Sequence, residues 1–217
     1  VFWVTNFDAE AYCPDLNHMS GERSIIWIQD DSGNFVPYHP LEGGDSVWVD
    51  LEEIPLRMQH AVIAIEDERF REHEGVDWNR TVAAMVNLVA NRVLNLGTTE
   101  YGGSSITQQL IKNLTKQDDI TVQRKLLEIF QATQMEKKYD KKTILEYYLN
   151  VIYLGQNCNG IKTAAETYYG KELEKLTLAE CASIISITNA PTYYDPYQNF
   201  ENNKLRKEKV LWAMREY

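Results

Sequence analysis

The sequence predicts a mainly α-helical fold with a small β hairpin near its N-terminus. From residue 55 onward, apolar residues recur three and four positions apart, which is the periodicity of helices with one buried face. Before residue 54, one stretch of β-prone residues surrounds a turn. The chain has 217 residues, 44% of them hydrophobic, which is enough to bury a substantial core. We therefore expect a lead-in over residues 1–53 and one helical domain over residues 54–217.

The hairpin is expected within residues 23–36, RSIIWIQDDSGNFV. Apolar residues lie on both sides of an Asp-Ser-Gly-Asn turn, a pattern typical of two paired strands. The stretch DSVWVDL, residues 45–51, is expected to add a short strand.

The first two helices are expected after Pro55, a residue that suits the first position of a helix. The first helix carries an apolar face over residues 56–65 and ends at the sequence EDERF. Asp77 is placed to cap the second helix. An apolar stripe from Trp78 then runs toward a stretch rich in Gly, Thr and Ser.

Later helices are bounded by local signals. Thr177 and Glu180 form a capping box, and Gly170 is placed to end the preceding helix. Further helices are expected at residues 106–114, 121–139, 141–154, 161–169, 178–187 and 202–216.

The charge distribution leaves one basic region in an acidic chain. The net charge is −10, and residues 112–142 carry +3 while residues 1–111 carry −12. This balance argues against a nucleic-acid partner, which needs a broad basic face, but allows a confined phosphate. Cys13, Cys158 and Cys181 lie far apart without a CxxC spacing, so we expect buried thiols and no metal site. No apolar run approaches the ~20 residues of a membrane span.

Three consecutive carboxylates, Glu66, Asp67 and Glu68, follow the apolar face of the first helix. Burial and repulsion between like charges can make such a group basic enough to take a proton from a substrate. Glu66 is the best candidate for a general base because it directly follows Ile65. The competing interpretation is three solvated acids at a helix end, and composition and spacing alone favour it.

A basic helix and a glycine-serine turn form the second candidate site. Arg124 and Lys125 precede Glu128 by four and three positions, so both cations can flank its carboxylate. In GGSSITQQLIKN, residues 102–113, the turn is expected to expose unpaired backbone N–H groups to an anion. We interpret it as a cradle for a phosphate or sugar phosphate, against the alternatives of a solvated ion pair and an ordinary turn. Neither GxxxxGK[ST] nor GxGxxG is present.

Taken in order, five stretches resemble glycosyltransferase family 51, the peptidoglycan transglycosylase domain of class A penicillin-binding proteins and of monofunctional transglycosylases. They are EDERFREHEG from Glu66, GGSSITQQLIKN from Gly102, RKLLE from Arg124, KKTILEYYLN from Lys141 and RKEKVL from Arg206. The likeness covers residues 54–214. Five stretches in family order are far more specific than any one of them.

The resemblance implies a lysozyme-like, two-lobed helical fold whose head lobe holds the catalytic carboxylates and whose membrane-facing jaw spans roughly residues 79–120. It implies an inverting transfer in which the 4-hydroxyl of an acceptor lipid II attacks the anomeric carbon of a lipid-linked glycan strand. A β-1,4 bond forms and undecaprenyl diphosphate leaves. The implied location is the outer face of the bacterial cytoplasmic membrane, with an N-terminal anchor helix and a possible C-terminal transpeptidase domain in the parent protein.

Carried onto this chain, the resemblance gives two residues catalytic roles. Glu66 would take the proton of the acceptor sugar, and Glu128 would orient cations or the phosphosugar. The motif around Glu66 would be shaped by Asp67, Phe70, His73 and Gly75.

Other residues would bind substrate or hold the cleft. The residues expected to contact the donor or its diphosphate, or to close that region, are Ser104, Thr107, Gln108, Gln109, Lys112, Asn113, Arg124, Lys125, Arg206 and Lys207. Glu146 and Asn150 are expected to hold the helices of the cleft together.

Two residues depart from the family pattern. Ser105 stands where Thr is usual, and Ile120 stands where many members have Arg. Lys116 and Lys138 are candidates to replace that cation. We expect no built-in metal or other cofactor, although Mg²⁺ or Mn²⁺ can accompany the substrate diphosphate.

Two alternative functions stay open. A lytic transglycosylase or lysozyme-like hydrolase would cleave glycan with a carboxylic acid on the same fold. A catalytically silent scaffold would bind glycan or partner proteins. The TQQL stretch beside a basic region favours the diphosphate substrate, and the family inhibitor moenomycin is expected to bind.

Overall fold

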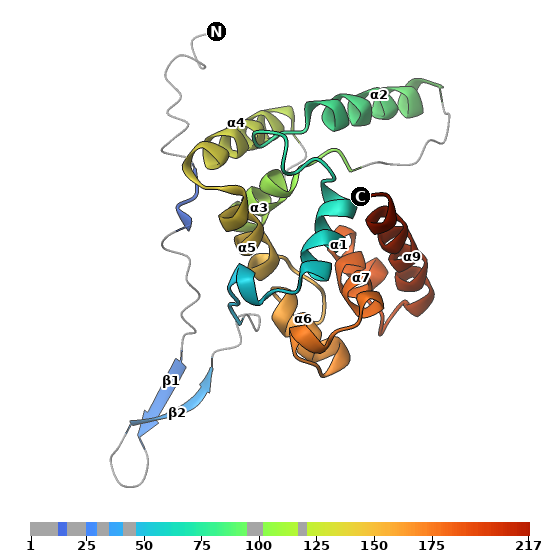
Figure 1. The fold of residues 1–217 in the computed structure, drawn as a ribbon. Coiled ribbons are helices and arrows are strands. Elements are labelled where there is room, and N and C mark those ends of the chain that lie inside the picture. Colours follow the sequence, from blue (N-terminus) through green and yellow to red (C-terminus); the bar gives the residue numbers. More distant parts are fainter. Residues whose placement is uncertain (1–12, 17–24, 30–34, 41–46, 95–101, 117–120) are drawn as a thin grey trace.

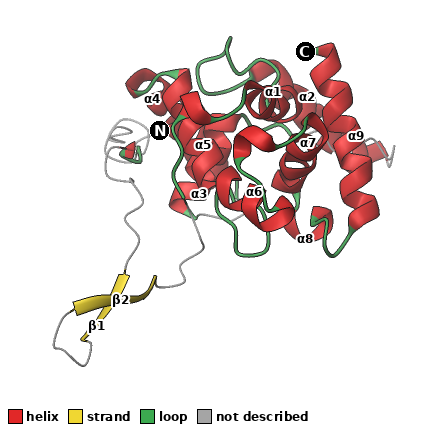
Figure 2. Cartoon of the chain, turned by 60° about the horizontal axis from the view of Figure 1, so that its bottom comes forward, coloured by secondary structure: helices red, strands yellow, loops and turns green. Residues whose placement is uncertain are grey.

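The computed structural model describes residues 13–16, 25–29, 35–40, 47–94, 102–116 and 121–217. Within these ranges the chain is mainly helical, which confirms the predicted fold class. The helices gather into one body, and the only strands of the described ranges lie apart from it in both views (Figures 1 and 2).

The N-terminal hairpin is confirmed. Strand β1 (Ile25–Gln29) pairs antiparallel with β2 (Phe35–Pro40), with a register irregularity between Ile26 and Trp27. The short strand predicted over residues 45–51 is wrong for its described part. Residues 47–50 are irregular and lead into the 3-10 turn η2 (Leu51–Glu53), because Val49 pairs with the Asn150 side chain and not with a strand.

One group of helices brings the two ends of the helical domain together. Helix α1 (Leu56–Glu66) packs against α7 (Leu178–Ser186) and α9 (Phe200–Glu216). The 3-10 turn η4 (Ile187–Asn189) and α8 (Pro191–Tyr194) connect α7 to α9. Glu66 therefore ends a helix whose neighbours come from the last 40 residues of the chain.

A second group lies on the other side of α1 (Figure 1). Helix α3 (Ile106–Thr115) packs against both α4 (Val122–Lys138) and α5 (Lys141–Val151), and α6 (Ile161–Tyr169) contacts α5 and α7. Thus α3, which carries most of the GGSSITQQLIKN stretch, contacts the helices that carry the RKLLE and KKTILEYYLN stretches.

Apolar side chains from both groups form one core. Residues with no exposed surface include Met58, Val62, Leu110, Ile144, Tyr148, Ile161 and Ile184. This core fixes the ends of α1, α3 and α7 relative to one another, which is what positions polar groups between them.

Helix α2 (Trp78–Leu94) exposes apolar residues along one face. Trp78, Val82 and Val86 are 59%, 54% and 60% exposed, and they lie one turn apart. In Figure 1, α2 and α4 run along the top of the molecule. No helix within the described ranges is both long and apolar enough to cross a membrane.

Several predicted helix ends are confirmed by their caps. Thr177 and Glu180 form the expected capping box, Gly170 ends α6 in the left-handed conformation, and Asp77 accepts a hydrogen bond from the Arg80 amide at the start of α2. Helix α5, expected over residues 141–154, ends at Val151. The chain turns back there, since the Gly160 amide donates to the Ile152 carbonyl (2.8 Å).

All three cysteines are free thiols. Cys158 and Cys181 are buried, as predicted, and Cys13 is half-buried. Burial raises the pKa of the Cys181 thiol and that of Cys13, so neither group is set up as a nucleophile.

Candidate active site

Glu66 is buried at the C-terminal end of α1, with 6% of its surface exposed. Its Oε2 accepts a hydrogen bond from Gln109 Nε2 (3.0 Å), and its Oε1 accepts one from Thr188 Oγ1 (2.8 Å). An Arg206 guanidinium nitrogen lies 3.7 Å from Oε1. The carboxyl is thus shielded from water and surrounded by donors from three separate elements, so the interpretation as a solvated helix-end acid is wrong for Glu66.

Asp67 is fully buried and joins the end of α1 to the start of α3. Its Oδ2 accepts from the Ile106 amide (2.9 Å), and both its oxygens lie within 3.0 Å of His73 Nε2. His73 Nδ1 is buried and finds no partner among the described residues. Asp67 and His73 therefore position Glu66 indirectly, by fastening the loop that follows it to α3.

Residues 70–75 complete this loop. Phe70 is buried under the Lys141 ammonium, which lies 4.5 Å from the ring centroid. Gly75 has φ +91°, and a Cβ there would lie 2.6 Å from the Ala132 carbonyl oxygen. No other residue fits at this position without moving α4. These contacts hold the loop that follows Glu66 against α4 and Lys141, and the role of Phe70 and Gly75 in shaping the Glu66 motif stays a prediction.

The glycine-serine turn before α3 is held by protein groups. The Ser105 side chain accepts from the Gln108 amide, the Gln108 side chain accepts from the Ser105 amide, and Asp67 takes the Ile106 amide. The expectation of unpaired N–H groups is therefore wrong at Ser105, Ile106 and Gln108. These donors are turned inward, where they fix the start of α3.

The carbonyl groups of the same turn face α2. Arg80 Nε donates to the Gly102 carbonyl (2.8 Å), and Thr81 Oγ1 donates to that of Gly103 (3.2 Å). The Arg80 guanidinium also donates to the Glu66 carbonyl oxygen. A single arginine therefore links the end of α1 to the glycine-serine turn.

Gln109 reaches Glu66 and is itself oriented by Tyr148. Tyr148 Oη donates to Gln109 Oε1 (3.0 Å), which leaves the Gln109 amide nitrogen directed at Glu66. Burial, and secondly the negative charges of Glu66 and Asp67, raise the pKa of Tyr148 well above its ordinary value. Tyr148 thus stays a neutral donor at any physiological pH.

The predicted cluster around Glu128 is present. Arg124 donates to Glu128 Oε2 (2.6 Å), and the Lys125 ammonium contacts Oε1. Lys125 Nζ also donates to Ser104 Oγ (2.9 Å). Glu128 is 4% exposed while its two cations are partly exposed, so the carboxylate holds positive charge at the surface beside the glycine-serine turn.

The remaining predicted residues fall into two sets. Thr107 and Gln108 are fully buried, and Thr107 donates to Glu136 (2.6 Å), so the structure gives both of them packing and capping roles. Lys112 is exposed, and Asn113 and Lys207 are partly exposed. Their predicted contacts with substrate stay predictions.

Arg206 reaches the site from α9. Its guanidinium stacks on Tyr194, with the central carbon 5.6 Å from the ring centroid, and approaches Glu66. Its Nε is buried without a partner within the described part of the chain. This arrangement leaves a positively charged donor beside the carboxyl.

Glu146 and Asn150, expected to hold the helices of the cleft together, both contact the segment before α1. Glu146 accepts from the Leu51 amide (2.8 Å), and Asn150 pairs with both backbone groups of Val49 (2.9 Å each). They fasten the segment before α1 to α5, in addition to their place on a helix of the site.

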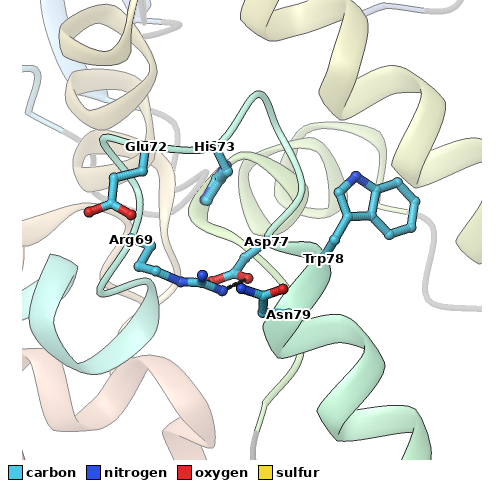
Figure 3. Close-up of a pocket in the computed structure, with 6 residues that line it drawn as sticks. All are labelled: Arg69, Glu72, His73, Asp77, Trp78 and Asn79. Atoms are coloured by element: carbon cyan, nitrogen blue, oxygen red, sulfur yellow. Dashed lines mark hydrogen bonds and ion pairs between the residues drawn. The ribbon is translucent and has the colours of Figure 1, made fainter.

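A pocket of about 210 Å³ lies beside the loop after Glu66 and is separate from the Glu66 carboxyl. Figure 3 shows Arg69, Asp77 and Asn79 facing one another there, with Trp78 turned away. Burial would raise the pKa of Asp77, but hydrogen bonds from the Arg80 amide and the Arg69 side chain outweigh burial and hold it below its ordinary value. Because these groups already pair with each other, the pocket is a capped helix start and we do not assign it a ligand.

Three residues of the site were not predicted from sequence: Arg80, Tyr148 and Thr188. Tyr148 lies within the KKTILEYYLN stretch, which was the one signal available for it. Arg80 and Thr188 carry no spacing signal, because their partners lie far away in the chain. No group of three or more His, Cys, Asp or Glu residues among those described could hold a metal ion, and Ile120 lies outside the described residues.

A family model described as Transglycosylase matches residues 36–215. Penicillin-binding protein 4 of Bacillus subtilis is 35% identical over 88% of this chain, which spans 30% of that protein's length. A putative transglycosylase of Cupriavidus necator is 39% identical over 78% of this chain and 71% of its own length.

Among the solved structures, a penicillin-binding protein also matches the chain. Penicillin-Binding Protein 1A from Haemophilus influenzae matches 88% of this chain and 18% of its own, at 22% identity and a TM-score of 0.46. Penicillin-binding protein 1F of Bacillus subtilis is 39% identical over 76% of this chain. Since the family model covers most of the chain and a relative is matched over more than two thirds of its length, this chain belongs to the transglycosylase family.

Proposed function

We propose that this chain is a peptidoglycan glycosyltransferase that polymerises lipid II into β-1,4-linked glycan strands with inversion. The observation that supports this most is the state of Glu66: a buried carboxyl, held by Gln109 and Thr188 and approached by Arg206, at the end of α1. A general base needs a fixed position and partial exclusion of water, and both are met here.

In the proposed reaction, the 4-hydroxyl oxygen of the acceptor sugar attacks the anomeric carbon of the donor strand. Its proton passes to Glu66, and the carbon–oxygen bond to the diphosphate breaks with its electron pair leaving on that oxygen. Attack on the face opposite the leaving group inverts the anomeric centre. A carboxylate has about four lone-pair sites, and Gln109 and Thr188 occupy two, which leaves room for the acceptor hydroxyl.

The leaving undecaprenyl diphosphate gathers negative charge, and we assign its stabilisation to the cations around Glu128. Arg124 and Lys125 are preorganised by the Glu128 carboxylate, so no reorganisation is needed when charge develops. Lys112, exposed on α3, is the third candidate cation. A Mg²⁺ or Mn²⁺ ion would be brought to this site by the substrate diphosphate itself.

A membrane surface is the proposed location of the reaction, because both substrates carry a lipid. Exposed apolar residues on α2 and α4 support this placement: Trp78, Val82, Val86, Leu126 and Phe130 are each 47–60% exposed. Exposed apolar side chains of this kind are costly in water when they are grouped and favourable at the boundary of a bilayer. We place the protein on the outer face of the cytoplasmic membrane, as the resemblance to peptidoglycan transglycosylase domains implies.

The test is the substitution Glu66→Gln, assayed with labelled lipid II in detergent. Polymerisation should fall by a factor of about 10² to 10⁴, the usual contribution of general-base catalysis. The matched control is Glu68→Gln, a neighbouring exposed carboxylate, which should keep near-normal activity. Cleavage of finished glycan by the wild type, without polymer formation, would instead identify a lytic enzyme.

A further inference from the structure

Thr188 contacts two acceptors with one proton. Its Oγ1 lies 2.8 Å from Glu66 Oε1 and 2.8 Å from the Ile185 carbonyl oxygen. A hydroxyl donates one hydrogen bond at a time and can accept others. The side chain therefore has two alternatives: it donates to Glu66, or it donates to Ile185 and offers a lone pair to Glu66.

The other oxygen of Glu66 meets a fixed donor. Gln109 Nε2 contacts Oε2, and the Gln109 amide cannot turn over without facing its nitrogen toward the Tyr148 hydroxyl, which now donates to Oε1 of that amide. The two carboxyl oxygens of Glu66 are therefore not equivalent. Oε2 faces a group that only donates, and Oε1 faces a group that can donate or accept.

We propose that Thr188 is a positioning residue that holds the Glu66 carboxyl in both of its protonation states. This inference rests on the proposed function, in which Glu66 accepts a proton. Before the transfer, Thr188 donates to the carboxylate at Oε1. After it, the proton on Oε1 is donated to Thr188 Oγ1, and the Thr188 hydroxyl turns to the Ile185 carbonyl. No proton leaves Thr188, so the carboxyl keeps its place through the catalytic cycle.

Other charged and titratable groups also face Glu66. Arg206 approaches from α9, Arg80 donates to the Glu66 carbonyl from α2, and Tyr148 lies behind Gln109 on α5. The Asp67–His73 pair follows in the loop. Thr188 hydrogen-bonds to none of these groups, so we expect them to keep their positions when its hydroxyl is removed, and a change in pH dependence can then be assigned to that hydroxyl.

The experiment compares Thr188→Val, which removes the hydroxyl at nearly constant shape, with Thr188→Ser, which keeps it. The readout is the pH profile of kcat/KM for polymerisation of labelled lipid II. Thr188→Val removes a charge-assisted hydrogen bond from the carboxylate and a weaker, neutral one from the protonated acid, so the acidic limb of its profile should move upward by about one pH unit. The Thr188→Ser limb should lie near that of the wild type.

Thr133→Val is the matched control. Thr133 Oγ1 also donates to a carbonyl within one helical turn, that of Ile129 (3.0 Å), but the Thr133 side chain forms no hydrogen bond to a residue of the site. The melting temperature of Thr133→Val should fall about as much as that of Thr188→Val, but the acidic limb of its pH profile should not move. Equal limb movement in both variants would overturn the inference.

The two proposals fail in different ways. If Glu66→Gln is inactive but Thr188→Val has the pH profile of the wild type, Thr188 only packs against Glu66 and the inference is wrong. If Glu66→Gln polymerises lipid II normally, the proposed role of Glu66 is wrong, whatever Thr188→Val does.

Discussion

At the scale of single residues, the site depends on a few side chains that each hydrogen-bond to two other residues. Asp67 holds both His73 and the Ile106 amide, and Arg80 holds the carbonyl groups of Glu66 and Gly102. Each of these two side chains joins two segments, so its loss would release both of them. Buried polar groups of this kind are costly to leave unpaired.

Gly75 gives the clearest residue-scale prediction. Gly75→Ala adds a Cβ 2.6 Å from the Ala132 carbonyl oxygen at φ +91°, and should lower the free energy of unfolding by about 3 kcal/mol. Gly170→Ala is the control, because Gly170 also has positive φ but nothing lies within 4 Å of the added atom. It should cost about 1 kcal/mol. Urea denaturation measures both, and equal costs would show that the Ala132 contact does not matter.

At the scale of elements, α3 connects the two halves of the site. Asp67 accepts a hydrogen bond from the first amide of α3, and Gln109, in the first turn of α3, donates to Glu66. In the turn before α3, Ser104 accepts a hydrogen bond from Lys125. The carboxyl and the cations are therefore positioned by one rigid helix and the turn that precedes it. A site on a helix is held more closely than a site on loops.

The exposed apolar face of α2 leads to a prediction about membrane binding. Val82→Ser with Val86→Ser removes apolar surface from the exposed face of α2 and should weaken binding to phospholipid vesicles by about tenfold or more. Activity on lipid II in detergent should change little. Co-sedimentation with vesicles is the measurement.

The control for this prediction is Leu205→Ser on α9, where an equally exposed apolar residue, 60%, is removed from another helix. If that variant loses vesicle binding as much as the double variant, the membrane-facing surface does not lie on α2.

At the scale of the whole molecule, the helices from the two ends of the domain close on one another. Helices α7 and α9 pack on α1, and that packing carries Thr188 and Arg206 to Glu66. Tyr148 is fully buried behind the site on α5, which packs against α3. Stability and the site geometry therefore depend on the same core.

Alkaline unfolding tests this burial. Because burial raises the pKa of Tyr148, the folded state keeps its proton above pH ~10 while the unfolded state releases it. Stability is thus fully present below pH ~10 and should fall above it by about 1.4 kcal/mol per pH unit from this group. Urea unfolding between pH 8 and 11 measures the slope. Tyr148→Phe should flatten it by that amount, and an unchanged slope would contradict the burial.

Much of the fold could be predicted because its signals are local. The Thr177–Glu180 capping box and the Gly170 stop lie within a few residues of the helix ends they set. The Glu128 cluster is also local, since Arg124 and Lys125 share its helix at spacings of four and three. The strand expected at residues 45–51 does not form in its described part, where the Asn150 side chain pairs with the Val49 backbone from 101 residues away.

By itself, the sequence determined the helical class, most helix ends, the pairing of Glu128 with its two cations and the choice of Glu66 as a candidate base. Only the tertiary structure decided that Glu66 is buried, that the amides of the glycine-serine turn point inward, and that Arg80, Thr188 and Arg206 meet at the end of α1. The physical reason is the sequence separation of the residues in contact. Caps and i,i+4 pairs act within one turn of a helix, whereas contacts between α1, η4 and α9 arise from packing of segments more than 100 residues apart, for which the sequence carries no period.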